Sequence, residues 1–154
     1  HTKLTADIQA KWLRKTGYVQ QNVYIFQGSL AENIALGCKD IDKEKINRIL
    51  KQVCLYDWVQ TLSKGMETSL GEFGNKISGG QKQRIGIARA LYKEAEIILL
   101  DEATSALDNE TEKEINNMLA SLRKTYIGLT ILSIAHRESS LSYCDRIINV
   151  NQES

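Results

Sequence analysis

With 154 residues, 42% of them hydrophobic and 25% charged, the chain is large enough for one globular domain with a buried core, and this composition excludes a disordered protein. Its 20 basic and 19 acidic side chains leave a net charge of +1, which excludes a basic field that would hold nucleic acid or an anionic membrane without specific contacts. No apolar run approaches the roughly 20 residues of a membrane-spanning helix, and three widely spaced cysteines predict packed thiols in a reducing compartment.

The first half of the chain predicts one strand and several helices. A turn of helix is expected over residues 6–13 and a short strand over 16–20. From Asp42, which is placed to cap it, apolar residues at i, i+3, i+4 and i+7 predict a helix. These residues are Ile46, Ile49, Leu50 and Val53. A second short helix is expected to turn four residues inward: Leu55, Trp58, Val59 and Leu62.

Five glycines punctuate residues 65–80, which predicts a loop that leads into a helix over 81–94. The apolar residues on one side of that helix are Ile85, Ala88, Leu91 and Tyr92.

The second half changes period. Residues 96–100 and 129–134 are short apolar runs, typical of strands buried on both faces. Between them an amphipathic helix begins near Asn109, with four apolar residues on one side: Ile115, Met118, Leu119 and Leu122. Strand, helix and strand in this order predict a parallel crossover unit, and a last strand is expected over 146–150. The predicted fold class is α/β, with a helical insertion in the first half.

Ser78 and Gln81 form an S-x-x-Q capping box for the helix that follows. Capping leaves Gly79 and Gly80 unexplained, because a glycine in a helix costs about 1 kcal/mol relative to alanine. Close approach of an oxyanion to the helix N-terminus would explain them. Capping alone and phosphate binding both remain open for this segment.

Asp101 and Glu102 follow the apolar strand at its carboxyl end, where ligands of open α/β sheets bind. Neighbouring strand residues point to opposite faces, so Asp101 could hold a magnesium shell while Glu102 polarises a water. The alternative is a pair of solvated acids before a helix. His136 follows the next strand and should emerge at the same rim, while Gln21 follows the first strand and is a weaker signal.

Together the strings ISGGQ (77–81), ILLDEATSALD (98–108) and IAHR (134–137) resemble, in this order and spacing, the ATP-binding cassette (ABC) family over nearly the whole chain. The resemblance implies a partial RecA-like (P-loop NTPase) core formed by residues 1–21 and 93–154, with an α-helical subdomain over 22–92. It also implies ATP and Mg²⁺ as ligands. The implied catalytic residues are Glu102, His136 and Gln21, with ATP contacts at Ser78, Gly79, Gly80, Gln81 and Asp108 and magnesium held by Asp101, through water, and by Gln21.

Residues 26–34 and 68–74 resemble segments of exporter-type ABC domains. By this resemblance Tyr24, Phe26 and Glu72 are coupling residues that meet a transmembrane domain. The implied partners are that domain and a second ABC ATPase domain in a head-to-tail dimer, with no nucleic acid. The implied location is the cytoplasmic face of the cell membrane, with this chain itself soluble.

The main departure from the family is that the chain contains no G-x-x-x-x-G-K-[S/T] phosphate-binding loop. We therefore expect a fragment that begins after that loop and that is inactive as an ATPase on its own. Two alternatives stay open. The parent could be a non-transporting ABC ATPase of DNA repair or chromosome organisation, or the isolated chain could be a binding module without catalysis.

Overall fold

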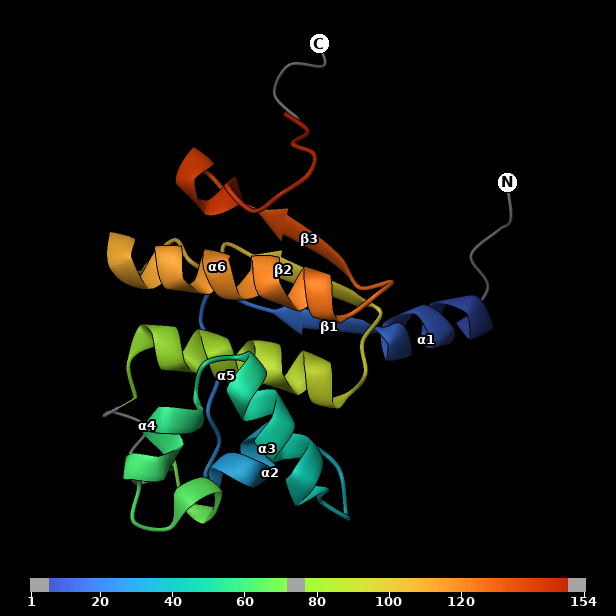
Figure 1. Cartoon of the computed structure of the whole chain (residues 1–154). Coiled ribbons are helices and arrows are strands. Elements are labelled where there is room, and N and C mark those ends of the chain that lie inside the picture. Colours follow the sequence, from blue (N-terminus) through green and yellow to red (C-terminus); the bar gives the residue numbers. More distant parts are fainter. Residues whose placement is uncertain (1–5, 72–76, 150–154) are drawn as a thin grey trace.

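The computed structural model describes residues 6–71 and 77–149, and it combines a three-stranded parallel sheet with helices (Figure 1). The strands are β1 (Thr16–Val19), β2 (Ile97–Asp101) and β3 (Thr130–Ile134), in the order β1-β2-β3. The helices are α1 (Ala6–Lys15), α2 (Leu30–Ile34), α3 (Lys43–Gln52), α4 (Tyr56–Thr61), α5 (Gly79–Tyr92) and α6 (Asn109–Thr125), with short 3-10 turns η1 (Gly65–Glu67) and η3 (Glu138–Leu141). The predicted α/β class is confirmed.

Capping side chains set where the helices begin. Asp42 accepts the Lys45 backbone N–H at 2.8 Å and starts α3, as its position in the sequence predicts. The short helix α2 was not predicted, although its capping box is readable in the sequence. Ser29 Oγ accepts the Glu32 N–H at 3.1 Å, and Glu32 accepts the Ser29 N–H at 2.7 Å.

Within the described residues, no helix is both long and apolar enough to cross a membrane.

Strand β1 pairs in parallel with β2 although α2 to α5 lie between them in the sequence. Lys15 and Glu96, which are 81 positions apart, form an ion pair just before the two strands begin, with Lys15 Nζ 2.6 Å from Glu96 Oε1. β2 then pairs with β3 across α6, with Asp101 opposite Ile134. All three strand arrows in Figure 1 point the same way, so the three carboxyl ends meet at one edge of the sheet.

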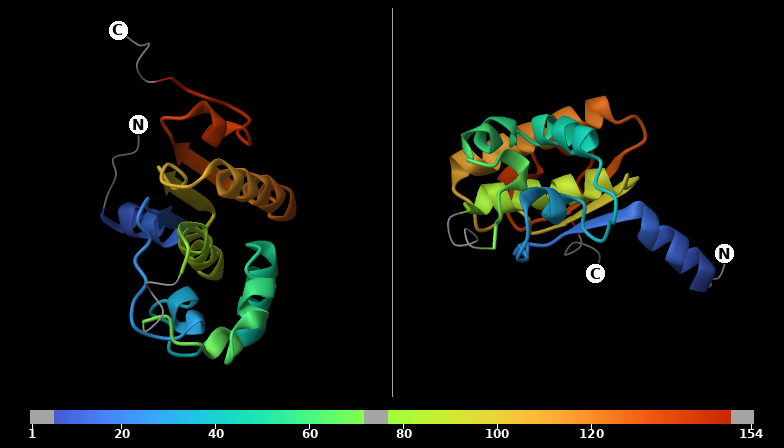
Figure 2. Two further views of the ribbon diagram at one scale, coloured as in Figure 1. Left: turned by 90° about the vertical axis from the view of Figure 1, so that its left-hand side faces the viewer. Right: turned by 90° about the horizontal axis from the view of Figure 1, so that it is seen from below.

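Helices α5 and α6 lie on the same side of the sheet (Figure 2). The strand residues that face them are buried, among them Val19, Ile98 and Leu100. At the closest approach of β1 to α5, a Cβ on Gly17 would overlap with Ala90. Glycine at this position is therefore required by packing, not by its backbone angles.

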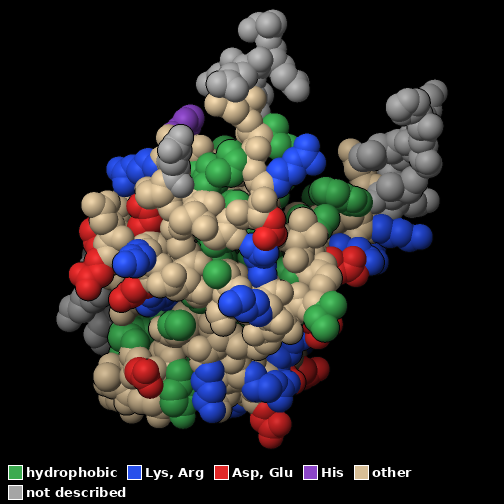
Figure 3. All heavy atoms as spheres, turned by 45° about the horizontal axis from the view of Figure 1, so that its top comes forward, with side chains coloured by type: hydrophobic (Ala, Val, Ile, Leu, Met, Phe, Trp, Pro, Cys, Tyr) green, Lys and Arg blue, Asp and Glu red, His purple; other side chains and the backbone are tan. Residues whose placement is uncertain are grey.

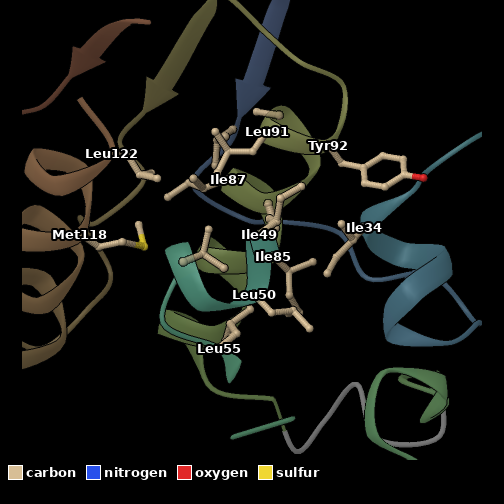
Figure 4. Packing of buried hydrophobic residues seen from close by; sticks show 14 of the residues in the cluster. Ile34, Ile49, Leu50, Leu55, Ile85, Ile87, Leu91, Tyr92, Met118 and Leu122 are labelled. Atoms are coloured by element: carbon tan, nitrogen blue, oxygen red, sulfur yellow. The ribbon is translucent and has the colours of Figure 1, made fainter. Parts of the chain in front are cut away.

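The main core lies between α5 and the small helices (Figure 4). Helix α5 contributes buried side chains to both the sheet side and the α3 side, so one core runs through the chain. Fully buried side chains of this region include Leu30, Ile34, Ile46, Leu50, Leu55, Ile85 and Ile87.

The prediction that both apolar strands are buried on both faces is wrong. Burial alternates along β3, where Leu132 is 57% and Ile134 is 50% exposed. The reason is that α5 and α6 cover only one face of the sheet among the described residues, so alternate side chains point to the uncovered face.

The predicted last strand over 146–150 is also wrong for residues 146–149, and Val150 lies outside the described residues. Ile147 and Ile148 are exposed there, and within the described part of the chain no strand lies beyond β3 to pair with this segment. Of the cysteines predicted to be packed, Cys38 and Cys54 are exposed and Cys144 is half-buried, and all three are free thiols.

We predict that the chain on its own self-associates through β3, because an apolar edge strand offers both unpaired backbone groups and exposed side chains to another copy. Light scattering should give an average mass that rises with concentration. Leu132→Lys should reduce this rise, because a charged edge disfavours pairing. Ile127→Lys is the matched control, since Ile127 is fully exposed but lies outside the strands. A concentration-independent monomer would contradict the prediction.

Candidate functional site

The carboxyl edge of the sheet gathers four of the predicted site residues. Asp101 ends β2 and Glu102 follows it, while His136 lies two residues after the end of β3. Gln21 lies two residues after the end of β1. The parallel pairing of the three strands therefore brings residues from three distant segments to one place.

Glu102 and His136 contact each other directly, with Glu102 Oε1 2.9 Å from His136 Nε2. The His136 side chain is 81% exposed and the Glu102 side chain 33% exposed, so the pair is open to a ligand from solvent. The backbone of Glu102 is left-handed, with φ of 48°, and its N–H donates to the Ile134 carbonyl at 3.0 Å. A left-handed glutamate costs on the order of 1 kcal/mol, and such strained residues cluster at functional sites.

Gln21 is linked to the backbone of Glu102 through Ser105. Gln21 Nε2 donates to Ser105 Oγ at 2.8 Å, and Ser105 Oγ donates to the Glu102 carbonyl at 2.9 Å. Ser105 lies in the string ILLDEATSALD (98–108), and the sequence did not predict this contact. The two polar links give Gln21 a fixed position beside Glu102.

Asp101 is held by a residue that the sequence reasoning missed. Tyr18 Oη donates to Asp101 Oδ2 at 2.6 Å, and this hydrogen bond raises the pKa of Tyr18 above its ordinary value. Tyr18 pairs with Leu99 in the register, two residues before Asp101, and lies on the uncovered face. Alternating side chains in β1 predict that Tyr18 points away from the core. That Tyr18 lies near Asp101 follows only from the register of β1 with β2.

The predicted capping box at Ser78 is confirmed. Ser78 Oγ accepts the Gln81 N–H at 3.2 Å and Gln81 Oε1 accepts the Ser78 N–H at 2.9 Å. The glycines also have a packing reason, because a Cβ on Gly79 would lie 2.9 Å from Leu107 and one on Gly80 would lie 2.5 Å from Thr111. Phosphate binding is thus not needed to explain Gly80, which is buried, whereas Gly79 and Ser78 are exposed at the helix N-terminus.

Asp108 is used inside the chain as the cap of α6. Its two carboxylate oxygens accept the Thr111 N–H at 2.9 Å and the Thr111 hydroxyl at 2.8 Å. These hydrogen bonds, the backbone one first, hold the pKa of Asp108 below its ordinary value. A contact of Asp108 with a nucleotide stays a prediction.

Of the predicted coupling residues, Tyr24 lines an open cavity of about 290 Å³, together with Tyr18, Val23, Gly86 and Arg89 among others. Tyr24 is 75% exposed. The backbone of Phe26 is fixed by buried Asn33, which accepts its N–H at 3.2 Å and donates to its carbonyl at 3.1 Å. Arg89 Nε donates to the Asn33 carbonyl at 2.7 Å, and burial lowers the pKa of Arg89. Glu72 lies outside the described residues.

The donor set suits a magnesium ion shared with a phosphate ligand. Mg²⁺ takes oxygen ligands and is usually held by one or two protein groups, with water and phosphate completing the shell. Asp101 and Gln21 would supply those protein oxygens. Within residues 6–71 and 77–149, no three His, Cys, Asp or Glu side chains are grouped so as to hold a metal ion. On the face shown in Figure 3, basic and acidic side chains are interspersed.

Comparison with known proteins gives one consistent result. The family model described as "ABC transporter" matches residues 1–105. The chain is 44% identical over 147 residues to an ATP-dependent lipid A-core flippase of Ralstonia nicotianae, covering 93% of this chain and 24% of the flippase. It is 48% identical to the flippase of Saccharophagus degradans over 130 residues, which cover 84% of this chain and 22% of the flippase.

Among solved structures, a bacterial Atm1-family ABC exporter with ATP bound matches with a TM-score of 0.70 and 38% identity. The match covers 83% of this chain and 22% of the exporter chain. The chain thus spans about a quarter of the length of the relatives it matches.

Proposed function

This chain belongs to the ABC transporter family, and from that premise we propose that it is part of an ATP-hydrolysing domain of an exporter, whose parent protein couples ATP hydrolysis to transport across a membrane. The observation that carries the proposal is the contact of Glu102 with His136 at the carboxyl edge of the sheet, with Gln21 tied to the same residue through Ser105.

We assign Glu102 the role of general base, which orients a water and accepts its proton. His136 Nε2 lies 2.9 Å from Glu102 Oε1, and His136 can itself contact the terminal phosphate, because its side chain is largely exposed. Gln21, held near Glu102, senses the same phosphate. Mg²⁺, held by Asp101 and Gln21 and by ATP, would neutralise the charge of the phosphates.

Ser78, Gly79 and Gln81 lie at the start of α5, and we assign them to the phosphates of an ATP that is held by a second ABC domain. The exposed N–H groups of a helix N-terminus and its positive dipole favour such an anion. Gly80 contributes by letting α5 pack on Thr111, as its buried position and close contact support. The proposed assembly is therefore a head-to-tail pair of domains.

The transmembrane partner is assigned to the surface around Phe26 and the cavity beside Tyr24. Asn33 and Arg89 fix the Phe26 backbone to α5, so a movement of this surface is passed to the helix that carries Ser78. This surface lies on the segment that begins with Gln21, which supports a route between the site and the membrane. The parent protein would then lie at the cytoplasmic face of a membrane.

Gly79→Asp in the full-length transporter tests the assignment of the α5 N-terminus to the phosphates of ATP. An acidic residue in the first turn stabilises a helix, but here it should repel the phosphates of the second domain's ATP. We expect ATP hydrolysis to fall by at least about tenfold, the effect of losing about 1.4 kcal/mol of transition-state stabilisation. A Cβ at this position meets Leu107, so any fall in the thermal unfolding temperature from that contact should also occur in a variant with an uncharged side chain of the same shape.

Gly79→Asn is the matched control, because it has the same shape without the charge. Phosphate release and thermal unfolding should be measured on both variants. Equal loss of activity in Asn and Asp variants would contradict an anion at this helix N-terminus.

A further inference from the structure

A buried carboxylate next to the site has no role in the proposed chemistry. Glu112 on α6 is only 3% exposed, and glutamate is almost never fully buried unless its oxygens are partnered. Its partners are two hydroxyls of η3: Ser139 Oγ donates to Glu112 Oε1 at 3.2 Å, and Ser140 Oγ donates to the same oxygen. Glu112 therefore anchors the turn that directly follows His136.

The same cluster also reaches the segment that follows Glu102. Thr104 Oγ1 donates to Ser140 Oγ at 3.2 Å, and both residues are buried. On the His136 side, Asn116 Nδ2 donates to the Ser139 carbonyl at 2.9 Å, and Arg137 Nη1 lies 3.9 Å from Glu112 Oε2. Glu112 thus joins, through Ser140, the two backbone segments that carry Glu102 and His136.

The contact between Glu102 and His136 is too exposed to hold these two segments in place. With the His136 side chain 81% exposed, solvent screens the attraction and the pair contributes little. Hydrogen bonds to a buried carboxylate are stronger, because the acceptor is charged and water does not compete for it. The β2–β3 pairing, in which the Glu102 N–H donates to the Ile134 carbonyl, fixes where the two segments begin. Beyond that pairing, the buried cluster is a stronger constraint than the exposed pair on the separation of Glu102 and His136.

We propose that Glu112 is a positioning residue that sets the separation of Glu102 and His136. The reason for a charged group in this buried place is that it can accept from two hydroxyls at once, without a donor hydrogen of its own that would need a partner. The catalytic consequence rests on the function proposed above for Glu102 and His136, whereas the geometric claim stands without it.

The geometric claim is tested by NMR on this chain, which has only two histidines, His1 and His136. In the unmodified chain, Glu102→Gln should shift the Cε1–H resonance of His136, because the two side chains are in contact. In a Glu112→Ala background, the shift caused by Glu102→Gln should be largely lost. A shift of the same size in both backgrounds would overturn the proposal.

The catalytic consequence is tested in the full-length transporter. Glu112→Ala should lower kcat by about 10- to 100-fold, the effect of misplacing a catalytic group by about 1 Å, with the KM for ATP nearly unchanged. Glu112→Gln keeps a carbonyl acceptor for the hydroxyls and should recover part of kcat. Glu110→Ala, an exposed glutamate on the same helix, should have no effect.

Ser140→Ala and Glu102→Gln, both in the full-length transporter, separate the possible outcomes. Ser140→Ala removes the link between Glu112 and Thr104 with little change in volume, so it should lower kcat even if Glu112→Ala fails to fold. If Glu102→Gln lowers kcat but Glu112→Ala, well folded, and Ser140→Ala do not, the positioning proposal is wrong. If Glu102→Gln leaves kcat unchanged, the proposed function is wrong, and the NMR result still decides the geometric claim.

Discussion

Glu102→Gln in the full-length transporter is expected to lower the rate of ATP hydrolysis by about 10²- to 10⁴-fold, the usual contribution of a general base. Glutamine has nearly the shape of glutamate but cannot accept the proton of water at neutral pH. Because Glu102 is at the surface of the sheet edge and Ser105 contacts only its backbone carbonyl, the substitution should leave the position of Gln21 unchanged. Binding of ATP should therefore persist.

Phosphate release and equilibrium binding of labelled ATP, measured on the same preparation, check both parts of this expectation. Glu110→Gln is the matched control, since Glu110 is an exposed glutamate at the start of α6. If the Glu102→Gln variant hydrolyses ATP at the unmodified rate, Glu102 is not the general base. Loss of ATP binding would instead mean that its charge takes part in holding the nucleotide.

Leu50→Ala is expected to destabilise this chain by about 2–5 kcal/mol, the range for truncating a buried leucine and leaving a cavity. Leu50 is fully buried and lies in the core between α3 and α5, close to Ile85 and Leu55 (Figure 4). The surrounding helices are held in place by their other contacts and can close the cavity only in part. Urea titration measures the free energy of unfolding. The slope of this free energy against urea concentration should be the same in the variant and in the unmodified chain.

Leu36→Ala makes the same chemical change at a side chain that is 61% exposed, and it should change the free energy of unfolding very little. Equal effects at the two positions would mean that the buried helical cluster is not the main source of stability. A loss at Leu50 with a reduced slope would show that the variant no longer unfolds in one step.

Local patterns in the sequence predicted the elements whose signals are strong. The spacing of Ile46, Ile49 and Leu50 after Asp42 gave α3, and the S-x-x-Q pattern at Ser78 gave the start of α5 within two residues. The placement of Glu102 and His136 at one rim followed from the order of the apolar strands, and their contact confirms it. These features depend on the period of a helix or on the common direction of the strands in a parallel sheet.

Features that depend on which segments meet in space could not be predicted in this way. Tyr18 reaches Asp101 because β1 lies beside β2, and Glu112 is buried because η3 packs on α6. An apolar run such as 129–134 also says nothing about whether a helix covers each face, which is why Leu132 was expected to be buried. The short helix α2 is a different case, because its capping box at Ser29 and Glu32 is a local signal that the sequence does contain.

The pairing of β1 with β2 across the inserted helices has a consequence for how the chain folds. Contacts of α3 with α2 and α4 are close in sequence and can form quickly. The contact of Arg89 on α5 with Asn33 on α2 spans 56 positions, and Gln21 and Ser105 are 84 positions apart. Closing so long a loop loses chain entropy before the strand pairing can compensate, so such contacts slow folding. The helical unit should therefore be protected early in a pulse-labelling hydrogen-exchange experiment, and the amides of β1 and β2 late. A chain still emerging from the ribosome would hold its helices well before residues 18–21 find their partners at 101–105.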